Sequence, residues 1–293
     1  MSRAVKRVGI LGHSGRPNVR RAATRLLARL ARRRIATRVD DELGGELGVR
    51  GHALGDLGRW SQLLVALGGD GTALRGARAL AGRAGALLSV NFGGMGFLTA
   101  AEEPELDQAV DAALAGRWST ARRRLVGVTV SRRGRRVRRG LAMNDAVIKA
   151  AGGYSALHLR LDALGSDLGH LVADGIIAAS ASGSTAYSLS AGGPVLSQNV
   201  EALVVTPVCP HTLGSRSLVL GGSDTLGVRL LGALDRVVLL LDGQEPEEVE
   251  AADEIQIALS RTSVRVLDNP ARPLARALHT KLGWQGSERR SLR

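Results

Sequence analysis

The sequence predicts an α/β amino-terminal domain with a Rossmann-like parallel sheet, followed by a β-rich, β-sandwich-like domain. The first prediction rests on short apolar runs that alternate with helix-like stretches, and on glycine-rich loops that follow two of these runs. The second rests on a change, from about residue 120, to short β-like runs separated by Gly, Asp and Ser. We therefore expect domains at 1–118 and 119–269, with a carboxyl-terminal segment, 270–293, that packs back on the first domain.

In the first domain we expect strands at 8–11, 63–67 and 86–90, and helices at 18–33, 73–81 and 104–114. The helix at 18–33 is amphipathic, because its apolar residues recur at helical spacing while arginines occupy the other side. The helix at 104–114 has Pro near its start and Gly116 just past its end, which are common positions for these residues. Two strand–loop–helix units result, and both loops follow the carboxyl end of a strand.

In the second domain we expect strands at 126–131, 142–149, 156–161 and 237–241. Gly134, inside the arginine-rich stretch 132–139, predicts a hairpin turn between short strands. Residues 271–282 are helix-like and form the part of the carboxyl-terminal segment that we expect to return to the first domain.

Composition limits the function classes that remain. The 293 residues carry 40 basic and 27 acidic side chains, a net charge of +13, with only three lysines. Such charge attracts polyanions, but two Phe, two Tyr and three Trp are too few for a surface that stacks single-stranded bases. We therefore interpret the arginine clusters at 32–34, 122–124 and 132–139 as solvated surface and expect no specific nucleic-acid partner.

Cysteine and hydropathy patterns point to a cytoplasmic protein that binds no membrane. Cys209 is the only cysteine, so neither an intrachain disulfide nor a cysteine-based zinc cluster is expected. No apolar run approaches the roughly 18 residues that a membrane-spanning helix needs, and we see no signal peptide.

The loop Gly68-Gly-Asp-Gly-Thr72 is the sharpest motif. Glycines allow positive φ and close approach of the main chain, so successive N–H groups next to a helix start can bind phosphate oxygens. Asp70 places a carboxylate where an anion would bind, which suggests that it binds metal or accepts a proton in phosphoryl transfer. The alternative is a tight turn with a solvated Asp, and the Walker A pattern is absent.

A second dense region runs from Asp174 to Pro194 and interleaves Ser and Thr with glycine. Small hydroxyl residues can hydrogen-bond ribose and phosphate without bulk, and Tyr187 can stack on a base. This region predicts a nucleoside pocket, although composition alone also fits an ordinary Ser/Gly-rich loop.

Taken together, these motifs resemble the NAD kinase family, in its order and over about residues 8–284. The matching blocks are Gly68–Thr72, Asn91-x-Gly-x-x-Gly-Phe-Leu-Thr99, Asn144-Asp145, Asp174–Pro194, Thr206–Thr212, Asp242-Gly-Gln244 and Thr280–Trp284. The first block is shared with diacylglycerol and sphingosine kinases, whereas Gly183-Ser-Thr-Ala-Tyr187 selects NAD kinase.

The resemblance implies an enzyme that phosphorylates the 2′-hydroxyl of the adenosine ribose of NAD, giving NADP, with ATP or polyphosphate as donor, Mg²⁺ as metal, and a homodimer or homotetramer as the assembly. Asp70 is implied as the catalytic carboxylate. The implied NAD-binding residues are Asp70, Gly71, Phe97, Asn144, Asp145, Asp174, Ser182, Thr185, Ala186, Tyr187, Ser190 and Asp242. Gly68, Gly69, Gly71 and Thr72 would bind the donor phosphates, and the metal would be bridged mainly by those phosphates rather than by protein ligands.

Position alone adds Arg75, one turn into the helix after the loop, as a phosphate-binding residue, with Arg216 as an alternative. Asp145 departs from the family's usual Glu, and Ala179-Ser-Ala-Ser182 replaces its usual Ser-Thr-Pro-Thr, so we expect changes in NAD binding before loss of the reaction. Two other functions stay open: a lipid kinase of the diacylglycerol or sphingosine type, and a non-catalytic NAD-binding regulator.

Overall fold

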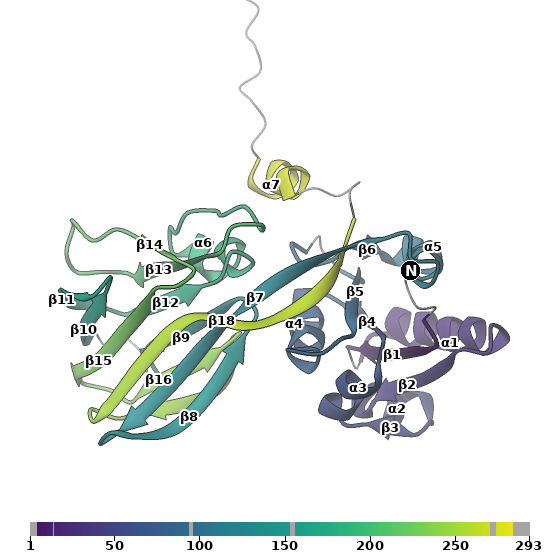
Figure 1. Cartoon of the computed structure of the whole chain (residues 1–293), viewed down its shortest axis with the longest axis horizontal. Coiled ribbons are helices and arrows are strands. Elements are labelled where there is room, and N and C mark those ends of the chain that lie inside the picture. The colour runs from purple at the N-terminus through teal and green to yellow at the C-terminus, as the bar shows by residue number, and fades with distance from the viewer. Residues whose placement is uncertain (1–4, 14, 94–95, 153–155, 270–273, 284–293) are drawn as a thin grey trace, which may run out of the picture. The chain divides into compact units, whose positions relative to one another are not determined.

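The computed structural model describes residues 5–13, 15–93, 96–152, 156–269 and 274–283. The chain divides into two compact units, residues 1–122 with 264–293 and residues 123–263. Two strands, β7 (Ser119–Arg132) and β18 (Asp253–Asp268), run from one unit into the other (Figure 1).

Unit 1 has a parallel sheet in the order β3-β2-β1-β4-β5, and the end of β18 adds to β5 in parallel. Its elements are β1 (Arg7–Gly12), α1 (Pro17–Arg32), β2 (Ala36–Asp40), α2 (Asp41–Leu47), β3 (Gly51–His52), α3 (Leu54–Trp60), β4 (Leu63–Gly68), α4 (Asp70–Ala79), β5 (Ala86–Asn91), β6 (Ala101–Glu102), the 3₁₀ turn η1 (Glu103–Glu105), α5 (Leu106–Leu114) and, after β18, α7 (Leu274–Leu282). The predicted parallel α/β domain is confirmed.

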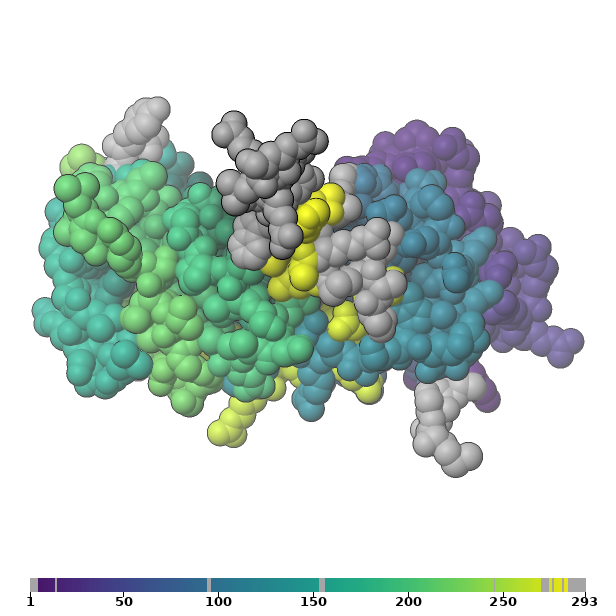
Figure 2. Space-filling view, turned by 90° about the horizontal axis from the view of Figure 1, so that it is seen from above, coloured from purple at the N-terminus to yellow at the C-terminus, as the bar shows by residue number. Residues whose placement is uncertain are grey.

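The core of unit 1 explains why these residues form these elements. Every residue of β4 is buried, as expected for a central strand covered on both faces. Helix α1 starts with Pro17 in its first turn and buries the apolar stripe that contains Val19, Leu26 and Leu30. Most of its arginines are exposed, while Arg29 is half-buried and pairs with Asp111. The purple atoms in Figure 2 belong to the amino-terminal part of this unit.

Unit 2 consists of antiparallel strands in two sheets, so the predicted β-rich domain is also confirmed. One sheet has the order β14-β13-β12-β9-β16-β17, and the other contains β11-β10-β15-β18 together with β7 and β8. The remaining elements are β8 (Arg135–Ala142), β9 (Asp145–Ala150), β10 (Leu157–Ala163), β11 (Ser166–Ala173), β12 (Gly175–Ala179), η2 (Gly183–Thr185), α6 (Tyr187–Ser190), β13 (Ala202–Val208), β14 (Leu218–Gly221), β15 (Thr225–Ala233), β16 (Val237–Leu241) and β17 (Gln244–Val249). One apolar core is built from residues of both sheets, among them Ile148 and Ile257.

The hairpin predicted at Gly134 is present. Arg133 and Gly134 have φ of 50° and 72° between β7 and β8, the backbone of a two-residue turn that matches strand twist. The same two-residue turn conformation recurs at Asp242 and Gly243, with φ of 53° and 68°, between β16 and β17.

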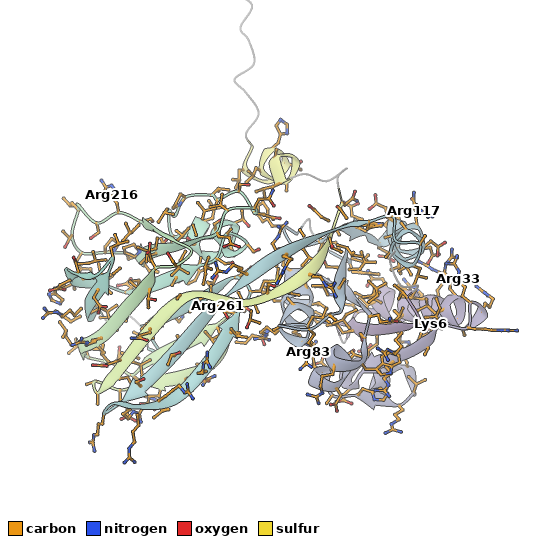
Figure 3. All side chains as sticks on the ribbon, viewed as in Figure 1. Lys6, Arg33, Arg83, Arg117, Arg216 and Arg261 are labelled. Carbon is orange, nitrogen blue, oxygen red and sulfur yellow. The ribbon has the colours of Figure 1, made fainter. Side chains whose placement is uncertain are left out.

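Several arginines do more than cover a solvated surface. Arg123 is buried and donates to Gln198, which corrects its interpretation as solvated. Arg124 pairs with Glu201, and Arg132 with Asp253. The basic side chains labelled in Figure 3 belong to both units, and most of them lie in loops or next to the end of an element. Among the described residues, no helix is both long and apolar enough to cross a lipid bilayer.

Candidate active site

The glycine-rich loop lies where β4 ends and α4 begins, at the carboxyl edge of the parallel sheet. Gly68 is the last residue of β4, Gly69 caps the helix, and Asp70 is its first residue. None of the loop glycines has positive φ, so our conformational reason for them is wrong: strand passes into helix without a left-handed residue. Space is the reason at Gly68, where a Cβ would lie 2.2 Å from Thr72 Oγ1. At Gly69 and Gly71 a Cβ would meet no atom within 4 Å, which leaves this backbone open to a ligand.

The Asp70 carboxylate is fixed by two backbone donors from the loop after β5. Phe97 N–H donates to Oδ2 at 3.0 Å, and Leu98 N–H donates to Oδ1 at 3.1 Å. Gly96 makes this approach possible, because a Cβ there would lie 2.2 Å from Asp70 Oδ1. The electrostatic cost of holding the Asp70 carboxylate in this loop is therefore offset by two N–H groups, and each oxygen keeps a lone pair that can accept a further hydrogen bond.

Arg75, predicted to bind donor phosphate, has two acidic partners. Its guanidinium lies 3.2 Å from Asp40 Oδ2 and 3.0 Å from Glu42 Oε1. Asp40 is almost fully buried at the end of β2, and burial raises its pKa to about 6 although Arg75 and the Gly12 N–H oppose this shift. Arg75 therefore forms ion pairs with two acidic side chains of its own unit. Arg216 is exposed and donates to the carbonyls of Leu213 and Ser215.

In unit 2, Asn144 and Asp145 are held by the turn residue Asp242. The Asp242 carboxylate accepts the N–H groups of Met143 at 2.9 Å and Asn144 at 2.7 Å, and Asp242 N–H donates to Asp145 O at 2.9 Å. Asp242 therefore positions the pair, which the sequence did not indicate.

Both side chains of this pair carry unusual features for buried groups. Burial, with a smaller contribution from the nearby Asp242 charge, raises the pKa of Asp145 to about 7. The Oδ1 atom of Asn144 is buried without a hydrogen-bond partner in the described part of the chain. Unsatisfied buried polar atoms are rare in native proteins, and each calls for an explanation such as strain, a catalytic role, or a bound water or ion.

The Ser/Gly-rich loop packs directly on this pair. A Cβ at Gly183 would lie 2.1 Å from the Asn144 carbonyl oxygen, so only glycine fits there. Ser180 Oγ donates to Met143 O at 2.6 Å, and its N–H donates to Asn144 O at 2.8 Å. The loop and the Asn144–Asp145 pair are thus joined by close packing and by hydrogen bonds from Ser180.

Many hydroxyls that we interpreted as ligand donors bind the protein itself. Thr185 Oγ1 donates to Ser182 O, and Ser184 Oγ donates to Ala181 O. Ser182 and Thr185 are buried, Ala186 is half-buried, and Tyr187 and Ser190 are exposed. Composition therefore overstated the number of free hydroxyls.

The other predicted residues lie elsewhere in the two units. In unit 1, Phe97 is half-buried and binds Asp70 through its backbone. In unit 2, Asp174 lies between β11 and β12 with its Oδ1 3.9 Å from His211 Nε2.

Comparison with known proteins now decides the family. A model of the ATP-NAD kinase N-terminal domain matches residues 8–118, and one of the C-terminal domain matches residues 143–268. The chain belongs to the NAD kinase family. The matches cover most of both units, so the resemblance deduced from the motifs is confirmed.

Relatives within the NAD kinase family support this assignment over nearly the whole chain. An NAD kinase of Desulforamulus reducens is 34% identical, with 89% of this chain and 91% of the relative covered. NAD kinase 2 of Streptomyces coelicolor is 35% identical, with 89% of each chain covered. The comparisons give no support to a lipid kinase.

Two solved structures share the NAD kinase fold. Yeast NADH kinase, complexed with NADH, has a TM-score of 0.89 at 24% identity and covers 99% of this chain and 91% of its own. An NAD kinase from Archaeoglobus fulgidus, in complex with ATP, has a TM-score of 0.74 at 23% identity. The match covers 94% of this chain and 98% of the Archaeoglobus chain. At these identities the similarity establishes the fold.

Sequence reasoning missed three residues of these clusters. Asp40 is visible in the sequence as an acidic residue, but nothing there indicates that its side chain is buried. Gly96 stood inside a quoted motif, yet its contact with Asp70 spans 26 positions of sequence. No sequence motif or pattern pointed to Glu42.

Proposed function

We propose that this member of the NAD kinase family phosphorylates the 2′-hydroxyl of the adenosine ribose of NAD with Asp70 as the general base. The observation that carries the proposal is the Asp70 carboxylate, held by the Phe97 and Leu98 N–H groups at the start of α4. Asp70 accepts the hydroxyl proton while the ribose oxygen forms a bond to the terminal phosphorus of the donor, and the bond to the leaving phosphate breaks.

We propose that the acceptor is bound through the second unit. Asn144 Oδ1, buried and without a partner among the described residues, accepts a hydrogen bond from the adenosine. Asp145 hydrogen-bonds the ribose, and Tyr187, which is exposed, stacks on a base. We keep Gly71, Phe97, Asp174, Ser182, Thr185, Ala186 and Ser190 as further NAD-binding residues. Asp242 acts by positioning Asn144 and Asp145.

For the donor, we propose that the open backbone at Gly69 and Gly71 binds phosphate oxygens, together with Gly68 and Thr72. The described residues contain no group of three or more His, Cys, Asp or Glu placed to hold a metal. We therefore propose that Mg²⁺ comes with the donor phosphates, where it neutralises charge on the transferred group. Arg75 is left out of this donor set because Asp40 and Glu42 already bind it.

The experiment is NADP formation by the purified protein with Mg²⁺, read with an NADP-specific dehydrogenase. ATP and polyphosphate are compared as donors, and NAD and NADH as acceptors. Turnover supports the proposal, whereas NAD binding without turnover on either donor would favour a regulator.

The mass of the protein in solution, measured by light scattering, tests the further proposal of a homodimer or homotetramer. Fractionation of source cells tests the proposed cytoplasmic location.

A further inference from the structure

Arg16, in the loop between β1 and α1, lies beside the glycine-rich loop through one intermediate residue. Its Nη1 donates to the carbonyl of Phe92 at 3.2 Å, and Phe92 N–H donates to Gly68 O at 3.0 Å. Phe92 therefore links the guanidinium to Gly68, the first glycine of the loop: its carbonyl accepts from Arg16 and its N–H donates to Gly68. The arginine is half-buried and belongs to the same edge of the parallel sheet.

The backbone around Arg16 is tied down independently. Gly15 N–H donates to Glu46, and His13 N–H donates to Leu67 O at 3.1 Å. Pro17 follows directly and starts α1. The backbone next to Arg16 is thus held by β4 and α2, and the guanidinium itself by the loop after β5.

The described residues supply no carboxylate that neutralises the charge of Arg16. Within the described residues, no carboxylate lies within ion-pair distance of it; Glu46 binds Gly15 N–H, and Glu103 binds Asn18. Arg75, by contrast, faces Asp40 and Glu42. A guanidinium has five N–H donors, and within the part of the chain that the structure describes Arg16 uses one of them, on the neutral carbonyl of Phe92. A half-buried, uncompensated guanidinium at a phosphate-binding edge is suited to bind an anion.

We infer that Arg16 binds the phosphate chain of the phosphoryl donor. This inference rests on the proposed function, because it assigns a residue to the donor side of that reaction. The ligand chemistry is a chain of phosphoanhydrides, which ATP and inorganic polyphosphate share, and the fork of the guanidinium fits two phosphate oxygens at once. Arg16 thus takes the role that position alone had suggested for Arg75.

The test measures donor binding and acceptor binding separately in Arg16→Ala and Arg16→Lys. The control is Arg21→Ala, which removes the same charge from an exposed position on α1. For each donor that the wild type uses, the KM for donor should rise about tenfold to a hundredfold in Arg16→Ala, as expected for loss of a charge-assisted hydrogen bond. The KM for NAD should stay within about twofold, and Arg16→Lys should lie between because it keeps charge but not the fork.

Calorimetry with inorganic tripolyphosphate, alone and without NAD, keeps the inference testable even if no NADP is formed. Tripolyphosphate should bind Arg16→Ala at least about tenfold more weakly than wild type and Arg21→Ala. Equal affinity for the three proteins, or a rise confined to the KM for NAD, would overturn the inference. Absence of turnover in wild type would instead overturn the proposed function, so the two failures are distinguishable. Thermal melts establish that each variant is folded.

Discussion

Gly96→Ala would displace the Asp70 carboxylate without touching its chemistry. A Cβ at position 96 would lie 2.2 Å from Asp70 Oδ1 and 3.0 Å from Cγ, so the carboxylate and the loop must separate by about 1 Å to reach normal contact. That movement also lengthens the hydrogen bonds from Phe97 and Leu98. Because a misplacement of this size can cost about 10²-fold in rate, we expect kcat to fall roughly 100-fold.

Steady-state NADP formation with donor and NAD both saturating measures this loss in kcat. Gly45→Ala is the matched control, since a Cβ there meets no atom within 4 Å and the residue is exposed on α2. A thermal melt shows that Gly96→Ala is folded. A folded Gly96→Ala enzyme with kcat within about twofold of wild type would refute the argument that the position of Asp70 sets the rate.

Three further variants test other parts of the account. Burial raises the pKa of Asp145 to about 7, so its contribution makes the folded state less stable as pH rises from about 4 to 7, by about 1.4 kcal/mol per pKa unit. Asp145→Asn should remove this contribution to the pH dependence of Tm. Identical Tm profiles for wild type and variant would contradict the prediction. Gly183→Ala should cost about 1–3 kcal/mol and raise the KM for NAD, because its Cβ meets the Asn144 carbonyl at 2.1 Å, and an unchanged melt and KM would oppose this. Arg132→Ala should cost about 3 kcal/mol in urea unfolding with kcat unchanged, since it leaves the Asp253 carboxylate buried and unpaired, and an unaltered midpoint would count against it.

Long apolar patterns predicted the fold well because the buried residues recur at helical spacing in α1 and form a continuous run in β4. The stripe of α1 and the buried run of β4 are visible in the sequence, and both appear where expected. The elements β2, α2, β3 and α3 were not predicted. They are two to seven residues long, and glycines interrupt both helices, so local periodicity is too short to detect.

The sequence supplied candidate residues for the site but not the contacts that the structure shows among them. Asp70 was identified by its motif, whereas its anchoring by Phe97 and Leu98 depends on a loop that follows a different strand. Arg75 was proposed from helical position, and the acidic pair that binds it comes from the end of β2 and the start of α2. Such pairings depend on which strands lie next to each other in the sheet. A single sequence does not specify that order.

The most direct test of the central claim compares wild type with Asp70→Asn. This change keeps the size of the side chain but removes the base, and general-base catalysis typically contributes about 10²- to 10⁴-fold. The account predicts that kcat for NADP formation falls by at least about 100-fold while the dissociation constant for NAD changes little. Near-normal turnover in Asp70→Asn would contradict the account.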